Sequence, residues 1–187
     1  MKRATGTLRI IAGEWRSRRV AFDADPAVGL RATPDRVRQP LFDWLGPFIS
    51  GASCLDLFAG SGALGLEALS RGAAHSVFID SGAQQIADIR AALTSFGALD
   101  RATLLQTEAL RWLANAQQRF DVVFLDPPFG STLIAQALPL LPLLLKPNNR
   151  IFLEWSGEAG PLPAGFEWLK DKRAGQVSYG LVTFQKS

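Results

Sequence analysis

Short apolar blocks recur along the middle of the chain, separated by polar and glycine-rich stretches. Each block predicts a buried strand, and the segment after it has the apolar spacing of a helix. The strands are expected near residues 54–58, 76–80, 102–106 and 120–125, and the helices near residues 63–71, 83–96, 108–114 and 131–145. This alternation predicts an α/β protein with a mostly parallel sheet.

The pattern changes on both sides of this repeating unit. After it, residues 150–155, 166–170 and 176–185 predict three further strands. The last two are close enough in sequence to form an antiparallel pair at the sheet edge. Before it, residues 8–12 and 18–22 predict a small hairpin. We therefore expect a seven-stranded sheet with an antiparallel C-terminal edge, preceded by a hairpin.

A helix is expected between the hairpin and the first strand of the sheet, over residues 35–45. Thr33 is a candidate cap for this helix, and Pro34 suits its first turn, where a missing N–H removes no hydrogen bond. Pro40 is expected to break or kink the helix, because a proline in the helix interior removes a backbone hydrogen bond.

Positive charge is concentrated at the start of the chain. The chain has a net charge of +3. Residues 1–40 hold nine Lys or Arg against four acidic residues, and the remaining residues together are slightly negative. Such a basic piece is suited to a polyanion, because phosphate contacts supply most of the nonspecific affinity for nucleic acid. We expect an RNA-binding extension at residues 1–48 and a main domain at residues 49–187. A solvated surface that only aids solubility is the other interpretation of the charge.

The residues expected to contact RNA are arginines of the extension and a tryptophan among them. Arginine can make a bidentate hydrogen bond to a phosphate or stack on a base, and a tryptophan ring offers a stacking face. The candidates are Arg9, Trp15, Arg16, Arg18, Arg36 and Arg38.

The remaining composition narrows the setting of the protein. An apolar share of 48% is typical of a globular protein, and no apolar stretch reaches the ~18 residues that cross a membrane. The basic start of the chain lacks the apolar region of a secretory signal, so we expect a cytoplasmic protein, and a monomer. The single cysteine, Cys54, is interpreted as a buried apolar residue, and His75 as structural. No metal site is expected.

A glycine-rich turn follows the first strand of the repeating unit. Residues 60–65, GSGALG, match the GxGxxG pattern, whose glycines permit a tight turn and close approach of a ligand. The pattern alone is weak and also fits a nicotinamide or flavin enzyme. Asp56 favours S-adenosylmethionine, because a carboxylate there can hold an ammonium group and would repel a dinucleotide phosphate. Asp80, which ends the next strand, can bind ribose hydroxyls in either class.

A second motif ends the strand at residues 120–125. In Asp126-Pro127-Pro128-Phe129, each proline fixes φ and offers no N–H, so the turn presents only acceptors. The Asp126 carboxylate and the neighbouring carbonyls suit an amino group, and Phe129 can stack on a flat ring. An ordinary strand-to-loop turn is the alternative for the tetrapeptide alone.

The two motifs are expected to meet, since ligands of such sheets bind beyond the carboxyl ends of the strands, near the switch in strand order. Five segments then carry a resemblance, in this order: RIIAGEWR (9–16), GLRATPDRVR (29–38), DLFAGSGALG (56–65), DPPF (126–129) and GQVSYG (175–180). They cover nearly the whole chain, which resembles the RsmD-like 16S ribosomal RNA guanine-N2 methyltransferases. The resemblance implies a class I, Rossmann-like fold and methyl transfer from S-adenosylmethionine to N2 of a guanine in 16S rRNA, within the small ribosomal subunit.

The resemblance also implies site residues. Catalysis falls to the Asp126 turn, namely Asp126, Pro127, Pro128 and Phe129. The residues implied to bind the cofactor lie at strand ends and in the glycine turn: Asp56, Phe58, Gly60, Ser61, Gly62, Asp80, Glu108, Ala109 and Asp126. Glu108 stands where aspartate is more usual, which keeps the charge, and Ala32 and Pro40 stand where proline and glutamate are more typical.

The mechanism expected is a direct displacement at the sulfonium methyl group, with no covalent enzyme intermediate and no metal. Asp126 and the Pro127 carbonyl would accept the two N–H bonds of the guanine amine, which orients its lone pair and stabilises the positive charge that develops. Phe129 would hold the flipped base by stacking. Asp126 would also collect the proton after transfer.

Other functions share parts of this pattern. An amino-methyltransferase acting on DNA or tRNA would use the same Asp126 turn, although the small hairpin leaves little room for reading a duplex. A nicotinamide-dependent oxidoreductase would use the glycine turn but leave the Asp126 turn and the basic extension without a task. An RNA-binding chaperone would transfer no methyl group to any RNA.

Overall fold

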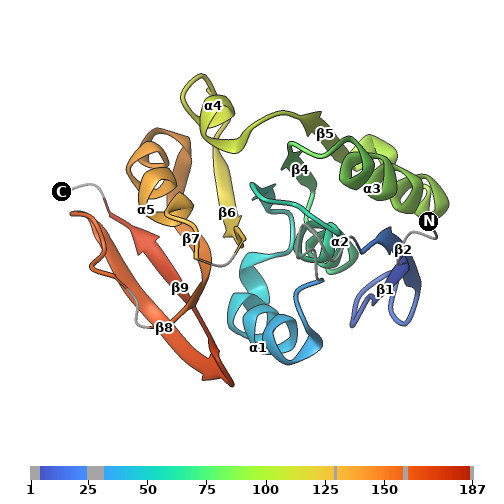
Figure 1. Ribbon diagram of the computed structural model, residues 1–187, viewed down its shortest axis with the longest axis horizontal. Coiled ribbons are helices and arrows are strands. Elements are labelled where there is room, and N and C mark those ends of the chain that lie inside the picture. The colour runs from blue at the N-terminus through green and yellow to red at the C-terminus, as the bar shows by residue number, and fades with distance from the viewer. Residues whose placement is uncertain (1–4, 25–31, 129, 158–159, 186–187) are drawn as a thin grey trace.

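The computed structural model describes residues 5–24, 32–128, 130–157 and 160–185, and its centre is a seven-stranded sheet (Figure 1). The strands lie in the order β5 (Ala102–Gln106), β4 (His75–Asp80), β3 (Ser53–Asp56), β6 (Phe120–Leu125), β7 (Leu145–Ser156), β9 (Val177–Phe184) and β8 (Phe166–Ala174). The first five are parallel, and β9 and β8 add an antiparallel edge. The predicted α/β sheet and its C-terminal edge are confirmed.

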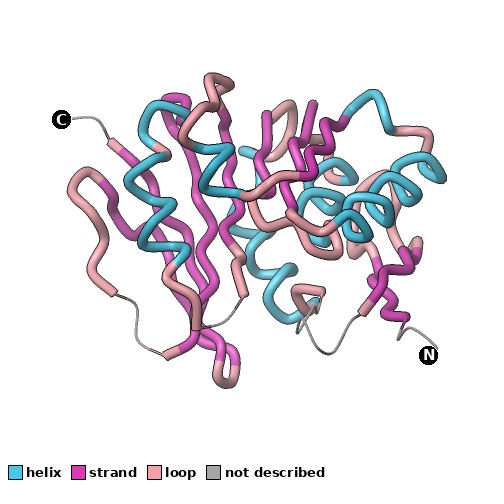
Figure 2. The backbone as a smooth tube through the Cα atoms, turned by 45° about the horizontal axis from the view of Figure 1, so that its top comes forward, coloured by secondary structure: helices cyan, strands magenta, loops and turns pink. Residues whose placement is uncertain are grey.

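Helices cover both faces of this sheet, because side chains of buried parallel strands point alternately to either side (Figure 2). On one face, Phe78, Phe124 and Phe152 pack with α1 (Asp35–Leu45), α2 (Ala63–Ser70) and α3 (Ala83–Phe96). On the other face, Val77, Val123 and Ile151 pack with α4 (Ala109–Leu113) and α5 (Leu133–Ala137).

The predicted helix over residues 131–145 is wrong in its length. Only α5 is α-helical, and it is followed by two 3₁₀ turns, Leu138–Leu140 and Pro142–Leu144. Pro139 and Pro142 explain the break, since neither can donate the hydrogen bond that continues an α-helix. Two further 3₁₀ turns, Gly46–Phe48 and Leu99–Arg101, precede β3 and β5.

The extension folds as a hairpin and a helix that share the core with the sheet. β1 (Thr5–Arg9) and β2 (Arg19–Asp23) pair in antiparallel fashion, with β1 three residues earlier than expected. Figure 1 shows this hairpin beside α2 and α3, on the far side of the molecule from β8. α1 spans its predicted residues and runs through Pro40 without a break, so the expected disruption is limited to one lost hydrogen bond.

Polar side chains of α2 hold the loop that connects β1 and β2. Glu67, which has no accessible surface, accepts hydrogen bonds from the backbone N–H groups of Ile11 and Ala12 at 2.8 and 3.0 Å. The Ser70 hydroxyl donates to the carbonyl of Ala12 at 2.6 Å and accepts from the N–H of Trp15 at 3.0 Å. These contacts fix the hairpin against the helix that follows the glycine turn.

Candidate active site

The glycine turn and the Asp126 turn lie at the same edge of the sheet. β3 and β6 are neighbours, with Asp56 opposite Phe124 in the parallel register. The chain proceeds outward from β3 through β4 to β5 and then returns to β6, so the strand order reverses between β3 and β6. This is the place where α/β sheets bind their ligands. The expected meeting of the two motifs is confirmed.

Asp80 shapes the glycine turn through both of its carboxylate oxygens. Oδ2 accepts from the N–H of Gly60 at 2.8 Å, and Oδ1 accepts from the N–H of Gly82 at 2.8 Å. Gly62 has a φ of +76°, and an added Cβ would lie 2.8 Å from Cγ1 of Ile89. Position 62 of the turn therefore needs a residue without a side chain. Asp80 lies beside the turn, and its carboxylate oxygens can accept further hydrogen bonds.

Asp56 lies beneath the turn, with 1% of its surface exposed. Its Oδ2 accepts a hydrogen bond of 3.0 Å from the N–H of Gly65, in the first turn of α2. Burial, and then the charges of Asp126 and Asp80, raise the pKa of Asp56 well above its usual range. The expectation that Asp56 holds an ammonium group directly is not met, because its carboxyl group faces the helix backbone and has almost no accessible surface.

The other residues expected at the cofactor frame the same edge. Phe58 is half-buried, and Ser61 and Ala109 are buried. Glu108 is exposed and caps α4 by accepting from the N–H of Arg111 at 3.4 Å. This edge of the sheet thus combines the aromatic ring of Phe58, the tight glycine turn and the accessible carboxylates of Asp80 and Glu108.

Asp126 is held by a residue of the N-terminal extension. The hydroxyl of Thr33 donates to Oδ2 of Asp126 at 2.7 Å. The predicted capping role of Thr33 is wrong, since Pro34 occupies the cap position of α1 and no side chain caps it. Burial raises the pKa of Asp126 to about 6, against the opposing effect of the Thr33 hydrogen bond. Pro127 is buried and Pro128 is exposed, whereas Phe129 lies outside the described residues.

Two polar side chains near Asp126 were not predicted as site residues from the sequence. Glu154 of β7 and Tyr179 of β9 are 5% and 0% exposed and are opposite each other in the antiparallel register. Burial, and then the charge of Asp126, raise the pKa of Glu154 to about 8, with Arg36 opposing. The available signal was one acidic residue inside the apolar run Ile151–Trp155.

Two of the six residues expected to contact RNA are buried. Trp15 is 2% exposed, and its ring stacks on Phe96 with the centroids 4.5 Å apart. Arg38 is 1% exposed and donates to the carbonyls of Thr33 and Arg9 at 2.9 and 2.8 Å. It also pairs with Asp35 and Glu67. Both predictions are corrected: these side chains hold the extension together and present no free face or charge.

The other four candidates, Arg9, Arg16, Arg18 and Arg36, are exposed. Arg9 pairs with Asp35 at 2.9 Å. The guanidinium of Arg18 lies 4.4 Å from the centroid of the Phe96 ring. Arg9 also lines a polar hollow of about 370 Å³ between the hairpin and the start of α1, together with Arg19 and Thr33. Arg19 was not expected, and this hollow reaches the residue that holds Asp126.

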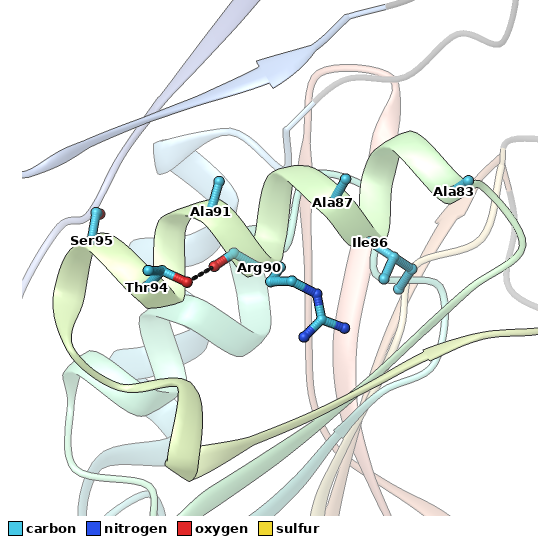
Figure 3. Close-up of a pocket in the computed structure, with 7 residues that line it drawn as sticks. All are labelled: Ala83, Ile86, Ala87, Arg90, Ala91, Thr94 and Ser95. Atoms are coloured by element: carbon cyan, nitrogen blue, oxygen red, sulfur yellow. Dashed lines mark hydrogen bonds between the residues drawn. The ribbon is translucent and has the colours of Figure 1, made fainter.

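A second hollow, of about 660 Å³, lies along α3 and is mostly apolar (Figure 3). Its lining includes Ile86, Arg90 and Thr94 but none of the expected site residues. Across the described parts of the chain, no group of three or more His, Cys, Asp or Glu side chains could hold a metal ion. None of the helices within the described ranges is long and apolar enough to cross a membrane.

The strand order, the glycine turn after β3 and the acidic turn after β6 define a class I methyltransferase fold. Within that class the chain belongs to the RsmD-like family: the family model described as conserved hypothetical protein 95 matches residues 8–183.

Individual relatives agree with this assignment. Ribosomal RNA small subunit methyltransferase D of Escherichia coli K12 is 41% identical over 184 residues, which cover 95% of this chain and 90% of that one. The solved structure of yhhF from Escherichia coli is 38% identical, with a TM-score of 0.88, and the match covers 97% of this chain and all of that one. The Thermus thermophilus 16S rRNA N2 G1207 methyltransferase was solved with AdoMet and guanosine. It has a TM-score of 0.69 at 20% identity, and the match covers 98% of this chain and 50% of that one. This similarity concerns the fold alone.

Proposed function

We propose that this protein transfers a methyl group from S-adenosylmethionine to the exocyclic N2 of a guanine in 16S rRNA. The observation that carries the proposal is the position of Asp126, which directly follows β6 beside the glycine turn and is held by Thr33 of the basic extension. Relatives named small subunit rRNA methyltransferases over nearly the whole chain support the same substrate.

The strand ends suit the polar groups of S-adenosylmethionine. Asp80, at the end of β4, has spare lone pairs for ribose hydroxyls, and Glu108 has the acceptors that an adenine amino group needs. The glycine turn with Gly60 and Gly62 allows close approach of the backbone. When bound there, the cofactor supplies an electrophilic methyl group.

The Asp126 turn suits the amine that receives this methyl group. The Asp126 carboxylate and the Pro127 carbonyl accept its N–H bonds, which orients the nitrogen lone pair and stabilises the positive charge that develops. The carboxylate then takes the proton that the methylated nitrogen loses. Phe129 provides the stacking surface for a flipped base.

The extension supplies the contacts to RNA in this proposal. Arg9, Arg16 and Arg36 carry exposed charge for phosphates, and Arg19 joins Arg9 in the polar hollow that leads to Thr33. Residues 1–48 would thus bind RNA, residues 49–187 would hold the cofactor, and the protein would act as a monomer in the cytoplasm.

Methyl transfer from tritiated S-adenosylmethionine tests the proposal. The substrates are small ribosomal subunits from a strain that lacks the protein, with free 16S rRNA, tRNA and DNA in parallel, followed by nucleoside analysis. N2-methylguanosine in the subunit or its rRNA is the expected result. Label in tRNA or DNA alone would overturn the ribosomal substrate, and calorimetric binding of NADH in place of S-adenosylmethionine would indicate an oxidoreductase.

A further inference from the structure

Three polar residues form a row across adjacent strands at the end of the site. Leu125 of β6 is opposite Leu153 of β7, so the next residues along these parallel strands, Asp126 and Glu154, are neighbours. Glu154 is in turn opposite Tyr179 of β9. All three side chains belong to the face of the sheet that α1 covers, because residues two positions before Asp126 and Glu154 and Tyr179 itself pack in that core.

Within the described ranges, no hydrogen bond or ion pair explains the burial of Glu154. Its Oε2 is buried without a hydrogen bond among the described residues, and so is the hydroxyl of Tyr179. Buried polar groups are normally paired, and an unpaired one is destabilising. A residue with these properties beside the proposed catalytic carboxylate is a candidate for ligand contact.

The proposed chemistry leaves part of the guanine unread. Asp126 and the Pro127 carbonyl account for the N2 amine, but the Watson–Crick edge of guanine also presents the O6 acceptor and the N1–H donor. A single group with one donor and one acceptor side by side matches both, and a protonated carboxyl group has this arrangement.

Resting on the function proposed above, we infer that Glu154 is a specificity-determining residue that recognises guanine by donating its carboxyl O–H to O6 and accepting N1–H. Ionised Asp126 beside it accepts from N2, so the two acids together present one donor and two acceptors to the acceptor and two donors of guanine. Adenine has no amine at position 2 and offers Asp126 nothing.

The charges around Glu154 favour this protonation state. Burial and the neighbouring Asp126 raise the pKa of Glu154 to about 8, above that of Asp126 at about 6, so Glu154 is the acid of the pair that holds its proton more strongly. The facing groups are Asp126 directly after β6, Tyr179 on β9 and Arg36 on α1, and Lys172 of β8 is opposite Tyr179. Arg36 opposes the shift and is exposed to solvent.

Two variants separate recognition from structure. Glu154→Gln keeps a donor and an acceptor in the same shape, whereas Glu154→Ala removes both. For the glutamine variant we expect kcat/KM with the rRNA substrate to stay within a few-fold of the wild type. For the alanine variant we expect it to fall about ten- to a hundredfold. S-adenosylmethionine binding by calorimetry should be unchanged in both, which also verifies that each variant is folded.

A substituted substrate tests the contact itself. Ligated 16S rRNA with 2-aminopurine at the methylated position, free or reconstituted into subunits, keeps the reacting amine but lacks O6 and N1–H. The wild type should methylate it about ten- to a hundredfold more slowly than the guanine substrate, and Glu154→Ala should discriminate little between them. Between about pH 7 and 9, wild-type kcat/KM should fall as Glu154 loses its proton, and Glu154→Gln should lack this fall.

Three results would overturn the inference. One is full activity of Glu154→Ala, and another is an equal penalty for 2-aminopurine in the wild type and in that variant. The third is a glutamine variant as weak as the alanine variant while both bind the cofactor. A wild type that methylates no 16S rRNA would refute the proposed function first, and the role of Glu154 in reading guanine with it.

Discussion

The hydroxyl of Thr33 donates a 2.7 Å hydrogen bond to Oδ2 of Asp126, although 93 residues separate the two in the chain. Thr33 belongs to the extension, and its own carbonyl accepts from Nε of Arg38 at 2.9 Å. Arg38 in turn binds the carbonyl of Arg9 in the hairpin and the carboxylate of Glu67 on α2. The proposed RNA-binding part and the proposed catalytic carboxylate are therefore connected through a short series of buried and partly buried hydrogen bonds.

Thr33→Val should impair the reaction without unfolding the protein. The hydrogen bond from Thr33 lowers the pKa of Asp126, so its loss should raise that pKa further above its ordinary range and move the acid limb of the pH–rate profile to higher pH. We expect kcat/KM near pH 7 to fall about ten- to a hundredfold, in line with one lost hydrogen bond to a charged group. Thr94→Val, on the exposed side of α3, is the matched control and should leave the profile unchanged. An unaltered acid limb in Thr33→Val would show that this hydrogen bond does not act on Asp126.

Asp126→Ala should abolish most turnover while leaving cofactor binding intact. The substitution removes both the acceptor for the amine and the group that collects the proton, and losses of about 10²- to 10⁴-fold are typical for such groups. Single-turnover methyl transfer measures the chemical step, and calorimetry measures S-adenosylmethionine binding. Asp100→Asn, an exposed change before β5, is the control. Near-normal turnover in Asp126→Ala would refute the mechanism.

The fold was largely predictable because alternating strands and helices leave a strong local pattern. The glycine turn and the Asp126 turn were recognisable for the same reason, since each is a short run of unusual residues. α5 was predicted too long because its apolar residues have helical spacing, but Pro139 and Pro142 decide where it ends. At the end of α5, the missing N–H groups of the two prolines thus outweighed the hydrophobic pattern.

Burial of charged residues was less predictable, since it depends on partners far along the chain. Arg38 resembles Arg36 in sequence, yet Arg38 meets Glu67 of α2 and is buried, whereas Arg36 faces solvent. Trp15 lies among arginines, but Phe96 of α3 covers its ring. Glu154 required knowledge of the register, because only the pairing of β6 with β7 places it next to Asp126.

The contrast between Arg36 and Arg38 provides a matched pair of mutations on one helix. Arg38→Ala leaves the carboxylate of Glu67 buried with one cation fewer, and breaking such a pair typically costs about 3–5 kcal/mol of unfolding free energy. Arg36→Ala should change stability by no more than about 0.5 kcal/mol, as for most surface substitutions, while weakening RNA binding and its salt dependence. Urea unfolding and filter binding at several salt concentrations measure the two effects. Equal loss of stability in both variants would contradict the buried network.

The pH dependence of stability should report the protonation of Glu154. The pKa of Glu154 is about 8 in the folded protein against an ordinary value of 4.5, so between these values the folded state binds more protons than the unfolded state. Unfolding free energy therefore decreases as pH rises through this window, and the contribution of protonated Glu154 is present in full only below pH 4.5. Glu154→Gln does not titrate, so its stability relative to the wild type should increase from pH 5 to pH 8. Urea unfolding of both proteins across that range measures the difference, and a constant difference would mean that Glu154 is ionised in the folded protein at neutral pH.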